Sequence, residues 1–209
     1  MPKILTITSS AREQESISSQ LSMIAAQEVE EYFYEAQIIH RDLNNSDISL
    51  ITSQWIDAYF TPKLQRNPGQ IASLRKSDLL INELKSCHAL VIGMPVYNFG
   101  MPASLKAYCD LICRAGSTFR QTDNGTTGLL ADRPTFIVVT SGTVSINSAT
   151  DFATPHLIKI LNFLGIHDIQ IVDATRLQSK DVGNRIAGAT YKIQEYVYQR
   201  FGEPETETA

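Results

Sequence analysis

The sequence predicts a doubly wound α/β fold, in which helices cover both faces of a five-stranded parallel sheet. Short apolar runs rich in β-branched residues alternate along the chain with longer stretches of helical spacing. Several of these runs are apolar at nearly every position, as strands buried on both faces are. Right-handed crossovers between five such strands favour the sheet order 2-1-3-4-5.

Five segments have the composition of strands, and the first, third and fourth are nearly continuous apolar runs. In chain order they are Lys3 to Thr8, Gln37 to Arg41, His88 to Met94, Thr135 to Thr140 and Asp168 to Asp173. In a doubly wound sheet, ligands bind where the central strands end. The residues that follow Thr8, Met94 and Thr140 are therefore the first candidates for a site.

Helical spacing is found between the strands. Ser16 or Ser18 can cap the first helix, which continues to about Tyr32. Further helices are predicted from Ser77 to Lys85, from Pro102 to near Gly116, from Ala153 to Leu164, and from about Asp181 to Phe201.

The length of 209 residues fits a single domain, residues 1–201, followed by a polar acidic tail, residues 202–209. The stretch from Leu43 to Leu74 is longer than a usual connection and contains Trp55, Tyr59 and Phe60. We expect it to be a partly helical excursion over the site or a subunit contact.

Composition limits the function classes. Hydrophobic residues make up 43% and charged residues 19% of the chain, with a net charge of −4, as in an ordinary globular protein. A nucleic-acid partner is not expected, because no basic stripe is present. The first strand is too short for a signal peptide and no window is long enough for a membrane span, so a soluble protein without a membrane partner is expected.

The cysteines and histidines predict neither a disulfide framework nor a metal site. Cys87, Cys109 and Cys113 are odd in number and lack a CxxC pair, which fits buried thiols in a reducing cytoplasm. The four histidines show none of the spacings that bring metal ligands together.

Two loops at the predicted strand ends have residues suited to a ligand. SSAREQESISS, after the first strand, brings serine hydroxyls to a helix start, where they either hold a phosphate or merely cap the helix. There is no GxGxxG, which favours a mononucleotide such as FMN over a dinucleotide. After the third strand, PVYNF offers aromatic faces and backbone donors to a flat ring, or forms an ordinary aromatic-rich turn.

The segment PVYNFGMPASLKAYCDLICRAGSTFR resembles the FMN-dependent NADH:quinone oxidoreductase and azoreductase family, whose members carry YNF, a helix and then RAG-x-TF. SSAREQESISSQL, DLLINELKSCHALVIGMP, DNGTTGLL, the TSG loop and ATDFATPHLIKILNFLGI extend the resemblance to about Ile166. It implies a three-layer flavodoxin-like fold that binds FMN.

The resemblance also implies which residues hold the cofactor. Phosphate and ribityl contacts fall on Ser10, Ser16, Ile17 and Ser18, ring contacts on Val96, Tyr97, Asn98 and Phe99, and contacts of the third loop on Ser141, Gly142, Thr143 and Val144. The third loop departs from the family, whose members often have a serine, a variable residue and two glycines. Here only Gly142 remains, and the loop is a residue shorter.

The implied chemistry is hydride transfer from NADH or NADPH to flavin N5, followed by a two-electron transfer from the same flavin to a quinone or an azo compound. No side chain needs to act as a catalytic acid, base or nucleophile. Phe119 and Phe163 are expected as apolar walls of a substrate site assembled across a homodimer interface, or as plain core packing. The alternative function is a flavodoxin-like FMN electron carrier without NAD(P)H turnover.

Overall fold

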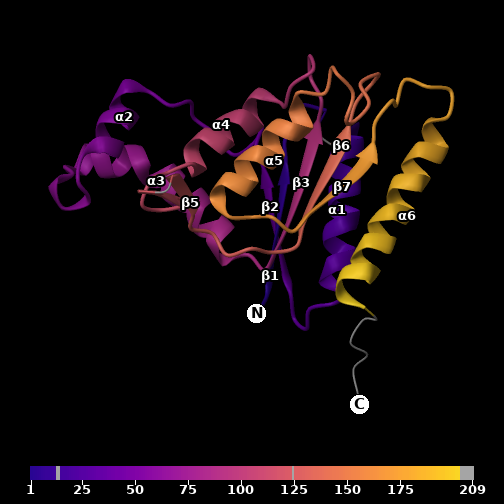
Figure 1. The fold of residues 1–209 in the computed structure, drawn as a ribbon, viewed down its shortest axis with the longest axis horizontal. Helices are drawn as coiled ribbons and strands as arrows, with labels where there is room; N and C mark the ends of the chain where they lie inside the picture. The colour runs from indigo at the N-terminus through magenta and orange to yellow at the C-terminus, as the bar shows by residue number, and fades with distance from the viewer. Residues whose placement is uncertain (13–14, 124, 203–209) are drawn as a thin grey trace.

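A parallel five-stranded sheet forms the centre of the computed structural model, which describes residues 1–12, 15–123 and 125–202 (Figure 1). The strand order is β2-β1-β3-β6-β7. The strands are β1 (Lys3–Thr8), β2 (Gln37–Asp42), β3 (Ala89–Pro95), β6 (Thr135–Thr140) and β7 (Ile169–Ala174). Each predicted strand forms within one or two residues of its expected ends, and the predicted α/β fold with a parallel sheet is confirmed.

Two short strands, β4 (Phe119–Thr122) and β5 (Gly125–Gly128), were not predicted. They pair as an antiparallel hairpin outside the main sheet. The sheet order therefore reads 2-1-3-6-7 rather than the predicted 2-1-3-4-5. The segments FRQT and GTTG are mostly exposed, so they lack the apolar pattern by which a strand is recognised in a sequence.

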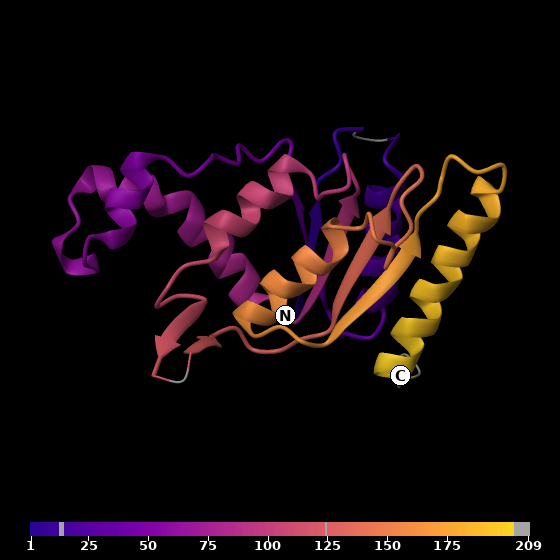
Figure 2. The same ribbon diagram turned by 45° about the horizontal axis from the view of Figure 1, so that its top comes forward.

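Six α-helices occur in the described part of the chain. They are α1 (Ile17–Glu30), α2 (Ser53–Phe60), α3 (Pro68–Ser86), α4 (Ala103–Ile112), α5 (Ala153–Leu164) and α6 (Val182–Phe201). α1 and α6 cover one face of the sheet, and α3, α4 and α5 cover the other (Figure 2). Neighbouring residues of a strand point to opposite faces. Accordingly Ile4 packs with α1 and α6, whereas Leu5 packs with the opposite layer.

α3 begins at Pro68, well before the predicted start at Ser77. A capping box fixes this start: the Asn67 side chain accepts from the Gln70 N–H at 2.9 Å, and the Gln70 side chain accepts from the Asn67 N–H at 3.0 Å. Together with α2, this longer helix confirms that the excursion from Leu43 to Leu74 is partly helical.

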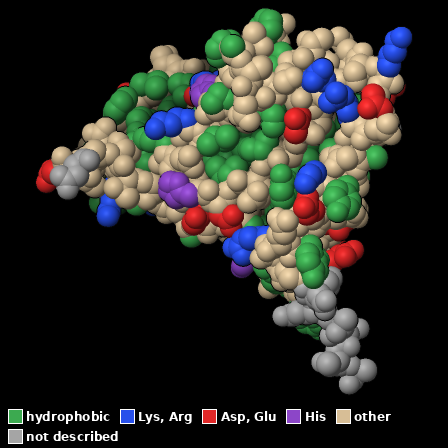
Figure 3. Space-filling view, turned by 45° about the vertical axis from the view of Figure 1, so that its right-hand side comes forward, with side chains coloured by type: hydrophobic (Ala, Val, Ile, Leu, Met, Phe, Trp, Pro, Cys, Tyr) green, Lys and Arg blue, Asp and Glu red, His purple; other side chains and the backbone are tan. Residues whose placement is uncertain are grey.

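Mixed charges and hydrophobic side chains share the surface. On the face shown in Figure 3, acidic and basic side chains are interspersed with hydrophobic ones. Among the helices described, none combines the length and the apolar character needed to cross a membrane. Residues 203–209 of the predicted acidic tail lie outside the described residues.

The three cysteines are free thiols. Cys87 and Cys109 are buried, as predicted, whereas Cys113 is only half-buried. Burial raises the pKa of all three, that of Cys113 to about 11. They therefore remain protonated and weakly reactive at neutral pH.

Asp132 joins the segment before β6 to the start of β7. One carboxylate oxygen, Oδ1, accepts from the backbone N–H groups of Arg133 at 2.9 Å, His167 at 2.8 Å and Asp168 at 3.0 Å. Desolvation raises the pKa of this carboxyl, but the three donors outweigh it, and the net shift is downward. The charged form is thus favoured by folding.

We expect Asp132→Asn to lower the free energy of unfolding at pH 7 by up to about 1 kcal/mol, a small value because the side chain is exposed. A lowered folded-state pKa contributes stability above the unfolded-state pKa, near 4, and loses it as the pH falls through the folded-state value. Urea unfolding between pH 7 and pH 3 should therefore show the two proteins converging in acid. A difference that stays constant over this range would contradict the assignment.

Candidate functional site

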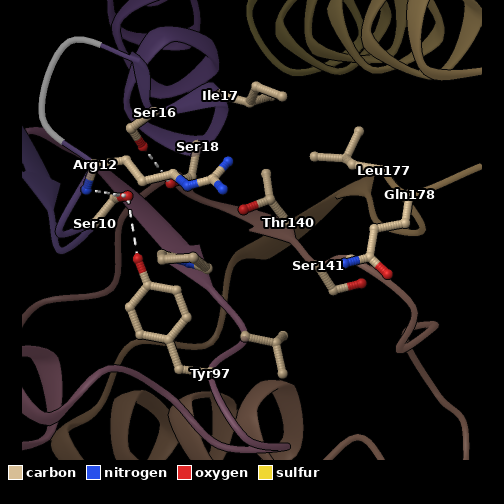
Figure 4. Close-up of a pocket in the computed structure, with 13 residues that line it drawn as sticks. Ser10, Arg12, Ser16, Ile17, Ser18, Tyr97, Thr140, Ser141, Leu177 and Gln178 are labelled. Carbon is tan, nitrogen blue, oxygen red and sulfur yellow. Dashed lines mark hydrogen bonds between the residues drawn. The ribbon is translucent and has the colours of Figure 1, made fainter.

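A cavity of about 350 Å³ opens where β1, β3 and β6 end (Figure 4). This is the edge of the sheet at which doubly wound proteins bind ligands, and the volume lies within the range of small-molecule sites. The cavity is lined by Ser10, Arg12, Ser16, Ile17, Ser18, Pro95, Val96, Tyr97, Thr140, Ser141, Gly142, Leu177 and Gln178.

The structure brings most of the predicted cofactor residues together at this cavity. The first loop contributes Ser10, Ser16, Ile17 and Ser18, the second Val96 and Tyr97, and the third Ser141 and Gly142. Asn98, Phe99, Thr143 and Val144 belong to the same loops but do not line the cavity. Three loops that are far apart in the sequence therefore meet at one place, as predicted.

Ser16 and Ser18 form the polar end of the cavity. Each is only 2% exposed, and their hydroxyl oxygens lie 3.1 Å apart. Ser16 also caps α1, because its hydroxyl accepts from the Ser19 N–H at 3.2 Å. The capping role and the cavity-lining role thus fall on the same residue. No acidic residue occurs in the first turn of α1, so the positive end of the helix dipole faces uncharged donors.

Tyr97 connects the first loop to the second. Its hydroxyl lies 3.3 Å from the Ser10 hydroxyl and accepts from the Ala11 N–H at 3.2 Å. Figure 4 shows the ring crossing from the end of β3 toward Ser10. The phenol therefore fixes the distance between the serine loop and the aromatic loop.

The aromatic loop is a two-residue turn. Tyr97 and Gly100 exchange backbone hydrogen bonds of 2.9 and 3.0 Å, and the two residues between them are left-handed, with φ of 49° at Asn98 and 70° at Phe99. Such a turn requires positive φ at both central positions. Asparagine tolerates this conformation, whereas a phenylalanine in it is uncommon. The turn presents the Phe99 ring, which is 51% exposed, beside the cavity.

The start of α5 is attached to this turn. The Phe152 N–H donates to the Phe99 carbonyl at 3.1 Å. The Phe152 side chain is itself 64% exposed. Two exposed aromatic rings therefore come from segments that are joined by a backbone hydrogen bond, two residues after the cavity-lining Tyr97.

The third loop is held by the segment that follows β7. Leu177 N–H donates to the Ser141 carbonyl at 2.9 Å, and Gln178 N–H donates to the Gly142 carbonyl at 3.0 Å. A Cβ at position 142 would lie 3.0 Å from the Gln178 side chain, so glycine permits this close approach. Thr143 is exposed and Val144 is half-buried, and neither reaches the cavity.

Five residues that line the cavity were not predicted: Arg12, Pro95, Thr140, Leu177 and Gln178. Arg12 lies within the predicted serine loop, and Pro95 and Thr140 end predicted strands, so their position could have indicated them. Leu177 and Gln178 follow the edge strand β7, after which the strand order predicts no site. Only their backbone hydrogen bonds to the third loop bring these two residues to the cavity.

Phe119 and Phe163 do not line the cavity. Their ring centroids are 4.7 Å apart, with Phe119 on β4 and Phe163 on α5, and both are partly buried against the core. This is the core-packing alternative. The unpredicted hairpin places Phe119 against α5. A contribution of these rings to a partner subunit's site stays a prediction.

Comparison with known proteins gives related sequences and folds. Residues 2–197 match the family described as having a flavodoxin-like fold. FMN-dependent NADH:quinone oxidoreductase 1 of Hahella chejuensis is 38% identical over 194 residues, covering 90% of this chain and 95% of the relative. The protein of the same name from Jannaschia sp. is 42% identical over 177 residues, covering 85% of this chain and 90% of the relative.

Solved structures share the fold. An FMN-dependent NADH-azoreductase from Bacillus anthracis str. Ames Ancestor, in complex with FMN, is 24% identical with a TM-score of 0.86, covering 97% of this chain and 100% of that one. The azoreductase AzrA is 18% identical with a TM-score of 0.85, covering 94% of this chain and 99% of that one.

Proposed function

The chain belongs to the flavodoxin-like fold family and, within it, to the FMN-dependent NADH:quinone oxidoreductases, and from this premise we propose a specific activity. The protein binds FMN in the cavity at the ends of β1, β3 and β6. It uses the cofactor to reduce quinones to hydroquinones and to cleave aromatic azo compounds, with NADH or NADPH as the electron donor. The observation that carries this proposal is the convergence of a serine loop and an aromatic turn on one cavity.

The chemistry of the lining residues fits FMN. A phosphate monoester needs hydrogen-bond donors and a positive potential, which the hydroxyls of Ser16 and Ser18 and the N-terminus of α1 supply. A flavin ring needs an apolar surface with a few polar groups, which Val96, Tyr97 and the third loop supply. The volume of about 350 Å³ suits a single mononucleotide more closely than a dinucleotide.

The residues of this chain bind and orient the cofactor, and they do not themselves react. The serine loop fixes the phosphate end, and the Tyr97 hydroxyl holds this loop at a set distance from the aromatic turn. When bound, FMN supplies a hydride acceptor at N5, reduced by NADH or NADPH in one half-reaction and reoxidised by the acceptor in the next, a ping-pong order. We assign no catalytic acid or base to the described residues that line the cavity.

The exposed rings of Phe99 and Phe152 are a second candidate for the substrate walls, beside the predicted pair Phe119 and Phe163. Phe99 belongs to the turn that begins at the cavity-lining Tyr97, Phe152 is hydrogen-bonded to Phe99 through the backbone, and both leave an aromatic surface in solvent. Quinones and azo dyes are flat and apolar, so stacking on such rings is the contact that they can make.

A homodimer is part of the proposal. The excursion between β2 and β3 lies away from the cavity, packs α2 on α3 and projects from the body of the molecule (Figure 2). Phe60 is 75%, Leu64 100% and Ile71 52% exposed along it. Exposed apolar side chains that gather in one region are typical of a protein–protein interface. This supports the subunit-contact alternative for the excursion.

The first experiment is the absorption spectrum of the purified protein, followed by anaerobic addition of NADH and then of a quinone. We expect flavin bands that NADH bleaches and the quinone restores. Flavin bands that NADH leaves unchanged would favour the electron-carrier alternative. A colourless protein that takes up no added FMN would overturn the proposal and leave only the family membership.

A further inference from the structure

Arg12 is the one charged side chain among the described residues that line the cavity. Its backbone is fixed on both sides, because its N–H donates to the Ser10 hydroxyl at 3.3 Å and its carbonyl accepts from the Glu15 N–H at 3.1 Å. Figure 4 shows the guanidinium directed toward the space between Ser18 and Thr140. The loop therefore carries a positive charge to the polar end of the cavity.

The guanidinium of Arg12 has no hydrogen-bond or ion-pair partner within the described part of the chain, whereas those of Arg41 and Arg200 are paired. Arg41 pairs with Glu83, and Arg200 pairs with Asp168. Glu15 is exposed and does not line the cavity. The positive charge of Arg12 thus adds to that of the α1 N-terminus, and no carboxylate among the described residues that line the cavity offsets it.

We propose that Arg12 is the residue that recognises the charge of the cofactor's phosphate and so makes the site select FMN over riboflavin, which lacks this group. The inference rests on the proposed function. Hydroxyls such as those of Ser16 and Ser18 donate to a phosphate but are themselves neutral. A guanidinium adds a charge-assisted, bidentate contact to a dianion.

This assignment predicts an effect that depends on the ligand. Loss of the Arg12 charge should weaken FMN binding about tenfold, a moderate value because the side chain is exposed to solvent. Riboflavin binding should stay unchanged, since riboflavin presents no anion to Arg12. Added salt should weaken FMN binding by the wild-type protein more steeply than by a variant without the charge.

The test is a titration of the flavin-free full chain with FMN and, separately, with riboflavin. Binding is monitored by the quenching of flavin fluorescence. Arg12→Gln should raise the Kd for FMN about tenfold and leave the Kd for riboflavin as it is. Arg12→Lys should recover part of the FMN affinity, because lysine keeps the positive charge but cannot donate two parallel hydrogen bonds from a planar group. Arg75→Gln is the matched control, since Arg75 is exposed on α3 and does not line the cavity.

Two outcomes would overturn the assignment of Arg12 while leaving FMN binding intact. One is an Arg12→Gln variant with wild-type affinity for FMN. The other is a variant that loses affinity for FMN and riboflavin equally, which would show a disordered loop rather than a lost charge contact. A wild-type chain that binds neither flavin would overturn the proposed function itself, and the inference with it.

Discussion

Gly128→Ala is expected to lower the free energy of unfolding by about 3 kcal/mol, the largest stability effect that we predict for one added methyl group. Gly128 ends β5 and lies directly against the C-terminus of α5. A Cβ at this position would overlap the backbone nitrogen of Gly165 and the carbonyl carbon of Leu164. Backbone atoms cannot rotate away as a side chain can, so the hairpin and the helix must separate.

The surroundings of Gly128 leave little room for such a separation. Two residues after Gly128, the Leu130 N–H donates to the Leu164 carbonyl at 3.0 Å. Gly165 is left-handed, with φ of 107°, and a Cβ there would lie 2.7 Å from the Leu130 carbonyl oxygen. Both glycines are therefore needed where the hairpin joins α5.

Chemical unfolding of the variant and the wild type measures the effect. Gly188→Ala is the matched control, because a Cβ at position 188 of α6 meets nothing within 4 Å. Alanine replaces a helical glycine there, so this control should gain roughly 0.5–1 kcal/mol. A Gly128→Ala protein as stable as the wild type would show that β5 does not pack as closely on α5 as the structure has it.

Asn98→Val should weaken FMN binding about thirtyfold, corresponding to roughly 2 kcal/mol. Asn98 has φ of 49° in the turn between Tyr97 and Gly100. A β-branched side chain is strained in this conformation, so the turn should open. Opening it displaces Tyr97 from Ser10 and Ala11 and thereby loosens both loops around the cofactor.

A fluorescence titration with FMN, paired with thermal unfolding, separates loss of the site from loss of the fold. Asn98→Gly is the control, because glycine adopts positive φ without strain and keeps the turn. We expect it to bind FMN within a few-fold of the wild type. If Asn98→Gly were as weak as Asn98→Val, the asparagine side chain, and not the turn, would be what the cofactor needs.

Much of the site could be predicted because it depends on local patterns. Apolar runs placed β1, β3 and β6, and parallel strands end at the same edge of a sheet, so the loops after Thr8, Met94 and Thr140 had to meet. The serines at the start of α1 and the aromatic turn after β3 follow directly from those strand ends. The resemblance to a known family added the cofactor, which periodicity by itself does not specify.

Contacts between segments distant in the sequence could not be predicted in the same way. The hairpin β4–β5 has no apolar alternation, and it brings the Phe119 ring against the Phe163 ring beside the core. The segment with Leu177 and Gln178 reaches the site only because its amides bond to the carbonyls of Ser141 and Gly142.

The sequence by itself determined the α/β class, the parallel sheet and the residues offered at its carboxyl edge, because periodicity and helix caps are local properties. Only the tertiary structure decided which of these residues line the cavity, that the guanidinium of Arg12 points into it, and that Phe99 and Phe152 stay exposed. These features depend on how separate segments pack against one another. The direction of a side chain after packing produces no periodic pattern in the sequence from which it could be predicted.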